Sequence, residues 1–495
     1  MKNKHILFLS TVLVTGASLA NAQQQSSQQQ LSERLNDLRV QSEIQSHHTK
    51  PNLPEKTEQI SNHQRDSSIS MSKAELRNYP DLVMRALVPA ILQGNIENVE
   101  LLYPIYQQIP EQYHDPIITH WSEAILAKQK QDYPKSIRLY RQIIAENKEI
   151  LPARLQLAIT LFEDNQLEAA EDQLTKLRTE PLATEIHILI ERYLAAINQR
   201  DRWNFNGGVT YLRDPNINNA PKNNIIRTNN NQGRLTGSTP ESAEGVGFNA
   251  DIGKKWSWGN GFFNELRLNS NGKYLWDNKK YNEANLRGSI GLGFQNAKYN
   301  IAALPFVAQY LYAGGSNQSE TLKRFSTTYG VTTEMNYWLQ PKWRWNINYE
   351  YGEQRYRSRL HLNGNYHFIS TGLLYFANAK QYWALNLNYN RTSTRDKDDS
   401  FFRRGAGLGW GQEWGYGFST HLSFNIAQKV HKAPTLILGL QRNKEYSVQV
   451  STWNRAIHFG GITPRLTYSY NKVKSNHQFT TYDKHRVFVE FSKQF

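Results

Sequence analysis

The hydrophobic and polar positions along the chain follow two different periods, and the change falls near Trp203. After this residue, apolar and polar side chains alternate, which is typical of β-strands with one apolar and one polar face. The polar positions carry Asn, Ser, Arg and Gly, and the apolar runs begin or end with Trp or Tyr, as in the aromatic girdles of outer-membrane barrels. The clearest examples are residues 284–294, 343–351, 383–390 and 418–426.

The alternating segments predict an antiparallel transmembrane β-barrel of about fourteen strands within residues 203–495, and an even number is expected for this class. Short turns and longer polar loops connect these segments in alternation. Short turns belong on the periplasmic side and long loops on the outside. A soluble sandwich would also alternate, but it would not need aromatic ends on strand after strand. The expected strands are 203–212, 246–257, 262–275, 283–295, 299–312, 324–338, 343–353, 360–376, 381–391, 401–413, 417–428, 443–454, 463–472 and 485–495.

Residues 73–200 have a helical pattern that repeats every 34 residues. This period and the spacing of small and large residues resemble tetratricopeptide repeats, in which paired helices pack closely. The alternative is an unrelated array of helical hairpins. Either arrangement makes a groove suited to peptides or partner proteins. The expected packing residues are Ala124, Ser136 and Tyr140 in one repeat and Ala158, Ala170 and Leu174 in the next.

The first 22 residues read as a secretory signal peptide. Lys2 and Lys4 precede an apolar run, and Ala20 and Ala22 form a cleavage site that would place the mature start at Gln23. A membrane anchor is the less favoured interpretation, because the apolar run is shorter than the ~20 residues needed to span a bilayer. Residues 23–72 are rich in Gln, Ser and charge, which predicts a disordered tether.

The last segment of the chain alternates strictly and ends on Phe. A terminal aromatic residue on the apolar face of a final strand is typical of the assembly signal of outer-membrane barrels. A soluble edge strand that happens to end on Phe is the alternative. The residues that we expect to form this signal are Val487, Val489, Phe491 and Phe495.

The charge is distributed unevenly. Residues 1–202 hold 22 Lys and Arg against 25 Asp and Glu, whereas residues 203–495 hold 36 against 18. A basic excess confined to the barrel fits a rim that pairs with lipopolysaccharide phosphates, or a lumen that steers an acidic substrate, and it argues against a nucleic-acid partner. The chain has no Cys, which excludes disulfides, thiolate metal sites and cysteine nucleophiles.

Motifs for catalysis are missing from the sequence. There is no Gly-x-Ser-x-Gly elbow, no His-Glu-x-x-His and no phosphate-binding glycine loop. The His residues, including His361, His367 and His485, have no Ser or Asp partner at a useful spacing. We therefore expect neither an enzyme nor a cofactor or metal site.

The order of these parts resembles the surface lipoprotein assembly modulator family. The best local match is the tail, from Gly461 to Tyr470, from Tyr482 to Val487, and Phe495. The resemblance implies an outer-membrane protein whose helical domain lies in the periplasm of a Gram-negative bacterium. It would move surface lipoproteins, or related secreted haem-binding proteins, to the cell surface. Implied partners are this passenger, a periplasmic chaperone, the barrel assembly machinery and outer-membrane lipid.

A polysaccharide or small-solute export porin shares the plan of helical repeats followed by a barrel, and it is the alternative function. Such porins usually carry more repeats than the two or three seen here. The sequence does not identify the passenger, the residues that contact it, or whether it leaves through the lumen or through the barrel wall.

Overall fold

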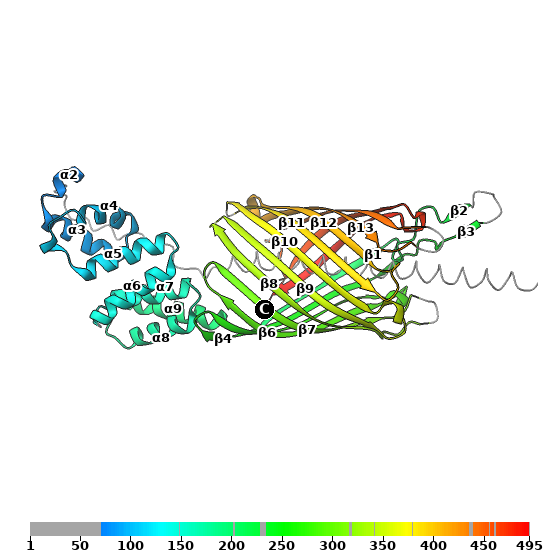
Figure 1. The fold of residues 1–495 in the computed structure, drawn as a ribbon, viewed down its shortest axis with the longest axis horizontal. Helices are drawn as coiled ribbons and strands as arrows, with labels where there is room; N and C mark the ends of the chain where they lie inside the picture. The colour runs from blue at the N-terminus through cyan, green and yellow to red at the C-terminus, as the bar shows by residue number, and fades with distance from the viewer. Residues whose placement is uncertain are drawn as a thin grey trace, which may run out of the picture.

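The computed structural model describes residues 71–147, 149–200, 203–227, 234–315, 319–340, 342–378, 380–434, 439–454, 456–459 and 462–494. They form a helical domain followed by a β-barrel, and the helical domain lies beyond one end of the barrel (Figure 1). The predicted fold class is confirmed. The end of the barrel next to the helices is called the helix-side rim below, and the opposite end is called the far rim.

The helical domain consists of antiparallel helices whose starts are set by local sequence signals. Asp115 and Asp132 cap α5 and α6 by accepting a backbone N–H, and a Pro follows each cap at the start of the helix. Gly94 ends α3 in the left-handed conformation that favours glycine. The helices are α2 (Lys73–Leu76), α3 (Pro80–Gln93), α4 (Ile96–Tyr106), α5 (Pro116–Gln129), α6 (Tyr133–Glu146), α7 (Leu151–Glu163), α8 (Leu167–Arg178) and α9 (Thr184–Arg200), with a short 3-10 turn, η1 (Glu111–Tyr113).

One continuous apolar core runs through the helical domain from Val83 to Ile197. Its members recur at the three- and four-residue spacing of helices, which is why each helix buries a single stripe. None of the helices in the described part of the chain is long and apolar enough to cross a membrane.

The barrel is a closed antiparallel sheet in which each strand pairs with its neighbour in sequence and β1 pairs with β16. The fourteen barrel strands are β1 (Asn204–Asp214), β4 (Ala243–Gly259), β5 (Phe262–Leu275), β6 (Glu283–Gln295), β7 (Tyr299–Tyr312), β8 (Lys323–Gln340), β9 (Trp343–Tyr356), β10 (Gly364–Asn378), β11 (Gln381–Thr394), β12 (Phe401–Glu413), β13 (Phe418–His431), β14 (Arg442–Asn454), β15 (Thr463–Ser475) and β16 (Tyr482–Gln494).

Two features of the far rim differ from the expected strands. Residues Leu360–Leu362 form a 3-10 turn, η3, so the strand expected from residue 360 begins at Gly364 and His361 lies in a loop. The long loop after β1 contains a small hairpin, β2 (Ile225–Arg227) and β3 (Arg234–Thr236), which projects beyond the far rim (Figure 1). Three further 3-10 turns are η2 (Lys279–Tyr281), η4 (Gly415–Gly417) and η5 (Gln478–Thr480).

The two faces of the barrel wall have opposite chemistry. Large apolar side chains on alternate positions are exposed on the outside, for example Ile290, Leu408 and Val487. Inward positions carry polar residues or glycine, and aromatic rings lie over some of the glycines. A Cβ at Gly411 would lie 2.1 Å from the Tyr382 ring, so a larger residue at this lumen-side position would have to displace that ring. The glycines of β12 thus make room for neighbouring side chains.

Candidate functional site

The predicted packing residues of the repeats lie inside the helical domain. The hydroxyl of Ser136 donates a hydrogen bond to the backbone oxygen of Ala124, at 2.8 Å, so a small polar residue fits between α5 and α6. At the equivalent place in the next repeat, Ala158 and Ala170 are both buried in the apolar core and carry no polar side-chain group. The six side chains are buried: Ala124, Ser136, Tyr140, Ala158, Ala170 and Leu174.

A polar residue that the sequence pattern did not reveal ties these helices together. The side-chain oxygen of Gln156 on α7 accepts hydrogen bonds from Trp121 Nε1 at 2.8 Å and from Tyr140 Oη at 2.7 Å. Its nitrogen donates to the backbone oxygen of Ile91 at 2.9 Å. Gln156 therefore joins α3, α5, α6 and α7 in one network, and no local signal marks it because its partners lie 16 to 65 residues away.

A pocket of about 280 Å³ opens between α6, α7 and α8. The pocket has an apolar floor, beneath which Leu157 and Leu161 are buried. Arg141 and Arg154 line its sides. Arg154 donates to Gln173 Oε1 at 2.9 Å, and Arg141 has no ion-pair partner within the described residues. Asp172 adds one carboxylate to the lining, but it pairs with Lys176 at 2.6 Å. An apolar floor with two cations therefore suits a peptide segment that combines an aliphatic and an acidic side chain. The pocket is lined by Arg141, Ile144, Arg154, Leu157, Leu161, Ala169, Asp172 and Gln173.

A buried carboxylate connects the helical domain to the barrel. Asp164, at the C-terminal end of α7, accepts the backbone N–H of Ala297 at 3.3 Å, and Ala297 lies in the turn between β6 and β7. Gln166 donates to the same carboxylate at 2.9 Å. Burial raises the pKa of Asp164, although Gln166, the Ala297 N–H and the nearby Lys298 oppose the rise. Helix α8 also lies against β4 at this rim.

Ion pairs cross the inner face of the barrel between strands that are not neighbours. Arg267 on β5 binds both carboxylate oxygens of Glu334 on β8, at 3.0 and 2.9 Å, and two more of its nitrogens bind Glu265 at 2.7 and 2.9 Å. The guanidinium is thus held between two carboxylates, with strands β6 and β7 lying between its partners. Bidentate pairs of this kind are among the stronger hydrogen-bonded contacts in proteins.

A second network lies one strand further round the wall. Arg287 on β6 donates to Glu350 on β9 at 2.9 Å and lies 3.6 Å from the ring centre of Phe306. Tyr366 donates to the other oxygen of Glu350 at 2.6 Å. Arg403 on β12 similarly donates to Glu445 on β14 at 2.9 Å. The lumen wall is therefore lined with charges of both signs, a surface that accepts polar chains and excludes hydrocarbon.

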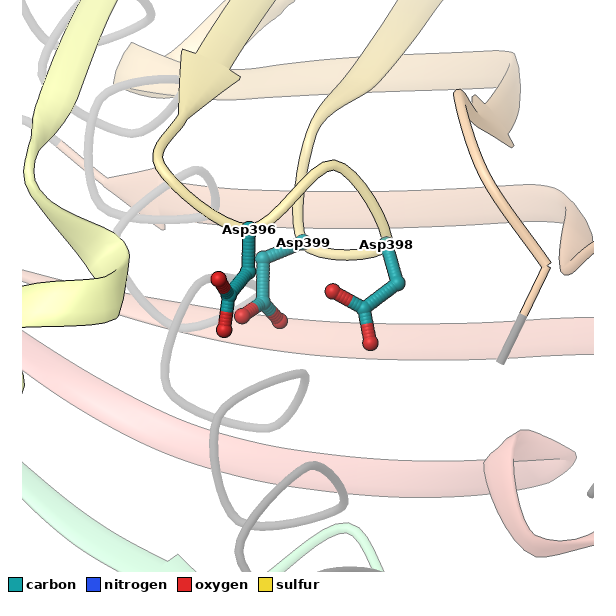
Figure 2. Close-up of side chains that lie close together, drawn as sticks. All are labelled: Asp396, Asp398 and Asp399. Atoms are coloured by element: carbon teal, nitrogen blue, oxygen red, sulfur yellow. The ribbon is translucent and has the colours of Figure 1, made fainter. Parts of the chain in front are cut away.

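Three aspartates gather in the far-rim loop between β11 and β12. One carboxylate oxygen from each of Asp396, Asp398 and Asp399 lies within 4.8 Å of the other two. The three side chains point to the same side of the loop (Figure 2). Burial and the adjacent Asp398 raise the pKa of Asp399 to about 6. Such oxygens could hold a hard cation such as Ca²⁺. Clustered carboxylates alone do not define a metal site, and we assign no role to this loop.

Three residues of the expected assembly signal, Val487, Val489 and Phe491, lie at outward-facing positions of β16. Val487 and Phe491 are exposed there, while Arg486 and Phe488 occupy the opposite parity and face inward. Phe495 lies outside the described residues, as do the cleavage-site residues Ala20, Ala22 and Gln23 and nearly all of the expected tether. The roles of these residues stay predictions.

A closed barrel with an apolar outer face, carrying a helical repeat domain at one rim, defines the class of integral outer-membrane β-barrel proteins. Two family models match the chain: "Surface lipoprotein assembly modifier" over residues 203–495, and the N-terminal repeats of the same family over residues 69–174. The chain therefore belongs to the surface lipoprotein assembly modifier family, which confirms the resemblance of its sequence to that family. The family and the barrel fold indicate an outer-membrane location and a role in assembly or transport.

Curated relatives match over most of their length. Surface lipoprotein assembly modifier 1 of Haemophilus influenzae is 43% identical over 496 residues, which covers 100% of each chain. The surface lipoprotein assembly modifier of Pasteurella multocida is 39% identical and covers 90% of this chain and 88% of its own. Surface lipoprotein assembly modifier 2 of H. influenzae is 38% identical and covers 86% of this chain and 87% of its own.

Proposed function

We propose that this protein transfers a surface lipoprotein, or a related secreted haem-binding protein, from the periplasm across the outer membrane. The observation that carries the proposal is the position of the helical domain, which contains a pocket and lies against the helix-side rim of the barrel. Asp164 forms a hydrogen bond to Ala297 at this junction, and the barrel lumen beyond it is lined with charges. The names of the relatives point to a surface lipoprotein as the passenger.

The orientation of the barrel supports a periplasmic helical domain. The helix-side rim carries short connections, such as residues 260–261 and 296–298, and the far rim carries long ones, such as residues 215–242. Outer-membrane barrels place short turns in the periplasm. A passenger that binds the helical domain would therefore meet the barrel from the periplasmic side.

The pocket between α6, α7 and α8 is the proposed receiving site, because its two arginines and apolar floor fit an acidic and aliphatic segment. A chaperone that delivers the passenger would act at this side. The barrel assembly machinery would recognise the final strand, and the basic residues of the far rim would contact lipopolysaccharide.

Surface display tests the proposal. The chain and a lipoprotein encoded beside its gene are expressed together in a Gram-negative host that lacks both, and intact cells are probed with an antibody to the lipoprotein. We expect a surface signal that depends on this protein. If several such lipoproteins stay inside while the barrel assembles normally, transfer is the wrong function and an export porin becomes the better one.

A matched pair of variants tests the receiving site. Arg141→Glu reverses a charge on the pocket wall, whereas Arg138→Glu makes the same change at an exposed position of α6 outside the pocket. We expect Arg141→Glu to reduce display about tenfold and Arg138→Glu to leave it nearly unchanged. Equal display by the two variants would place the receiving site elsewhere.

A further inference from the structure

The seam between β1 and β16 has the shortest backbone ladder among the described barrel strands. It consists of six residue pairs, from Asn206–Gln494 to Tyr211–Val489. By contrast, β1 pairs with β4 over eleven residues, and β16 pairs with β15 over eleven. Each seam strand is thus held much more firmly on its other side, because ladder hydrogen bonds increase with the length of pairing.

The pairing ends on the side of the far rim. Beyond Tyr211, residues 212–214 of β1 pair only with β4, and residues 482–488 of β16 pair only with β15. This part of the wall has two adjacent strand edges without a shared ladder. Such edges are the places where a sheet can separate or accept another group.

Side chains close this part of the seam. Lys484 Nζ lies 3.0 Å from Asp214 Oδ2, and Arg486 Nη1 lies 3.9 Å from the same oxygen. Lys222, in the loop after β1, pairs with Asp483 of β16 at 2.8 Å. One buried carboxylate therefore faces two cations across the seam, and the contact depends on charge rather than on backbone pairing.

The two faces of the seam differ in polarity. Val209, Tyr211 and Val487 are exposed on the outer, lipid-facing side, while Asp214 and Lys484 are buried on the inner side. A slot between these strands would have a polar inner edge and an apolar outer edge. That profile fits a polypeptide with covalently attached acyl chains, because the acyl chains would lie in lipid while the polar chain stays in the lumen.

We propose that the seam between β1 and β16 opens sideways on the far-rim side and releases the acylated segment of the passenger into the outer leaflet. The charged lumen excludes hydrocarbon, so the acyl chains need an exit through the wall. This inference rests on the proposed function, and it names the acylated segment as the part of the passenger that the seam recognises.

Engineered disulfides test the opening, because the chain contains no native Cys. Tyr211→Cys with Val489→Cys locks the seam, and Thr210→Cys with Glu490→Cys locks the next pair. Both pairs are used because successive pairs alternate between close and wide spacing. The matched controls keep the same β1 cysteine but join it to β4, as Tyr211→Cys with Val246→Cys and Thr210→Cys with Gly247→Cys.

With complete cross-linking, shown by gel shift, we expect the seam lock to reduce lipoprotein display at least tenfold and a reductant to restore it. The β4 lock should leave display near the wild-type level. Normal display by a fully locked seam would overturn the sideways exit and leave the proposed function intact. No display by the wild type would instead overturn the proposed function, whereas loss of display in both locks would show that the seam is not the specific exit.

A second measurement does not depend on disulfide formation. Asp214→Asn removes the charge that closes the seam, and Glu283→Gln removes a comparable ion pair, with Lys273 at 2.8 Å, across the full ladder of β5 and β6. In nanodiscs, Asp214→Asn should speed amide exchange of residues 206–211 and 489–491 several-fold, whereas Glu283→Gln should not. The charge swap Asp214→Lys with Lys484→Asp should slow the amide exchange of the seam residues again. Unchanged seam exchange in Asp214→Asn would contradict the closing role of this charge.

Discussion

Apolar side chains point inward in the helical domain and outward in the barrel. Leu174 and Ile143 are fully buried in the helical core, whereas Ile290 and Val487 on the barrel are 60% and 58% exposed. Polar groups show the reverse, since the barrel buries Arg267 between carboxylates on its inner face. Each part therefore matches a different solvent, water for the helices and lipid for the barrel.

This contrast shows what holds each part together. The helical domain depends on the hydrophobic effect and close packing, so its stability is concentrated in a few buried side chains. The barrel depends on a closed ladder of backbone hydrogen bonds, which lipid makes obligatory. The same substitution should therefore have very different effects in the two parts.

The largest expected effect comes from a charge in the helical core. Leu174→Asp would bury a carboxylate without a partner and should destabilise the helical domain by about 4 kcal/mol or more, enough to unfold it. Loss of the helical far-UV signal, with the barrel still resistant to detergent on an unheated gel, would show this. Retention of the helical signal would contradict a shared apolar core.

A charge on the outer face of the barrel should cost less and depend on depth. Leu408→Arg places a cation near the middle of β12 and should destabilise the barrel by about 2–4 kcal/mol. Leu339→Arg, near the end of β8, should cost about 0–1 kcal/mol. Reversible unfolding in lipid vesicles measures the free energy of unfolding of both variants. Equal losses in the two variants would contradict the expectation that Leu408 lies near the middle of the membrane and Leu339 near its edge.

A smaller effect is expected where a polar group sits inside the apolar core. Gln156→Ala leaves Trp121, Tyr140 and the Ile91 carbonyl without this partner, which should destabilise the helical domain by about 1–3 kcal/mol. Gln129→Ala removes one exposed hydrogen bond to Glu100 and should change stability by less than ~0.5 kcal/mol. Urea unfolding followed by the helical signal compares the two variants.

The smallest expected effect is a pH dependence at the junction. Because burial raises the pKa of Asp164 above its ordinary value of 3.8, its contribution to folding is complete below that value and is lost as the pH rises through the folded-state pKa. Asp164→Asn keeps an acceptor for the Ala297 N–H and should flatten this part of the profile. Helix melting temperatures across an acidic pH series provide the measurement. An unchanged profile in the variant would assign the dependence to other groups.

The sequence predicted the strands because a two-residue period is a local signal, and strands such as β5, β6 and β7 have the expected bounds. The small hairpin of β2 and β3 was missed because its surroundings are polar and do not alternate. The six packing residues of the repeats could be recognised from their 34-residue spacing.

The contacts that define the site could not be predicted from the periodicity of the sequence. Asp164 meets a residue 133 positions later, and Asp214 meets Lys484, which is 270 positions away. The partners of Arg267 lie on strands separated by two others. Such pairs depend on closure of the barrel and on docking of the helices, which a single sequence does not encode at any fixed spacing.

The pairing of β1 with β16 also determines the order in which the wall is completed. Every other ladder joins strands that are neighbours along the chain and can form as hairpins, whereas this one joins the first and last barrel strands. The entropy cost of loop closure is greatest for this ladder, so we expect it to form last. Until then both strands present open edges that a folding factor can hold by adding a strand of its own.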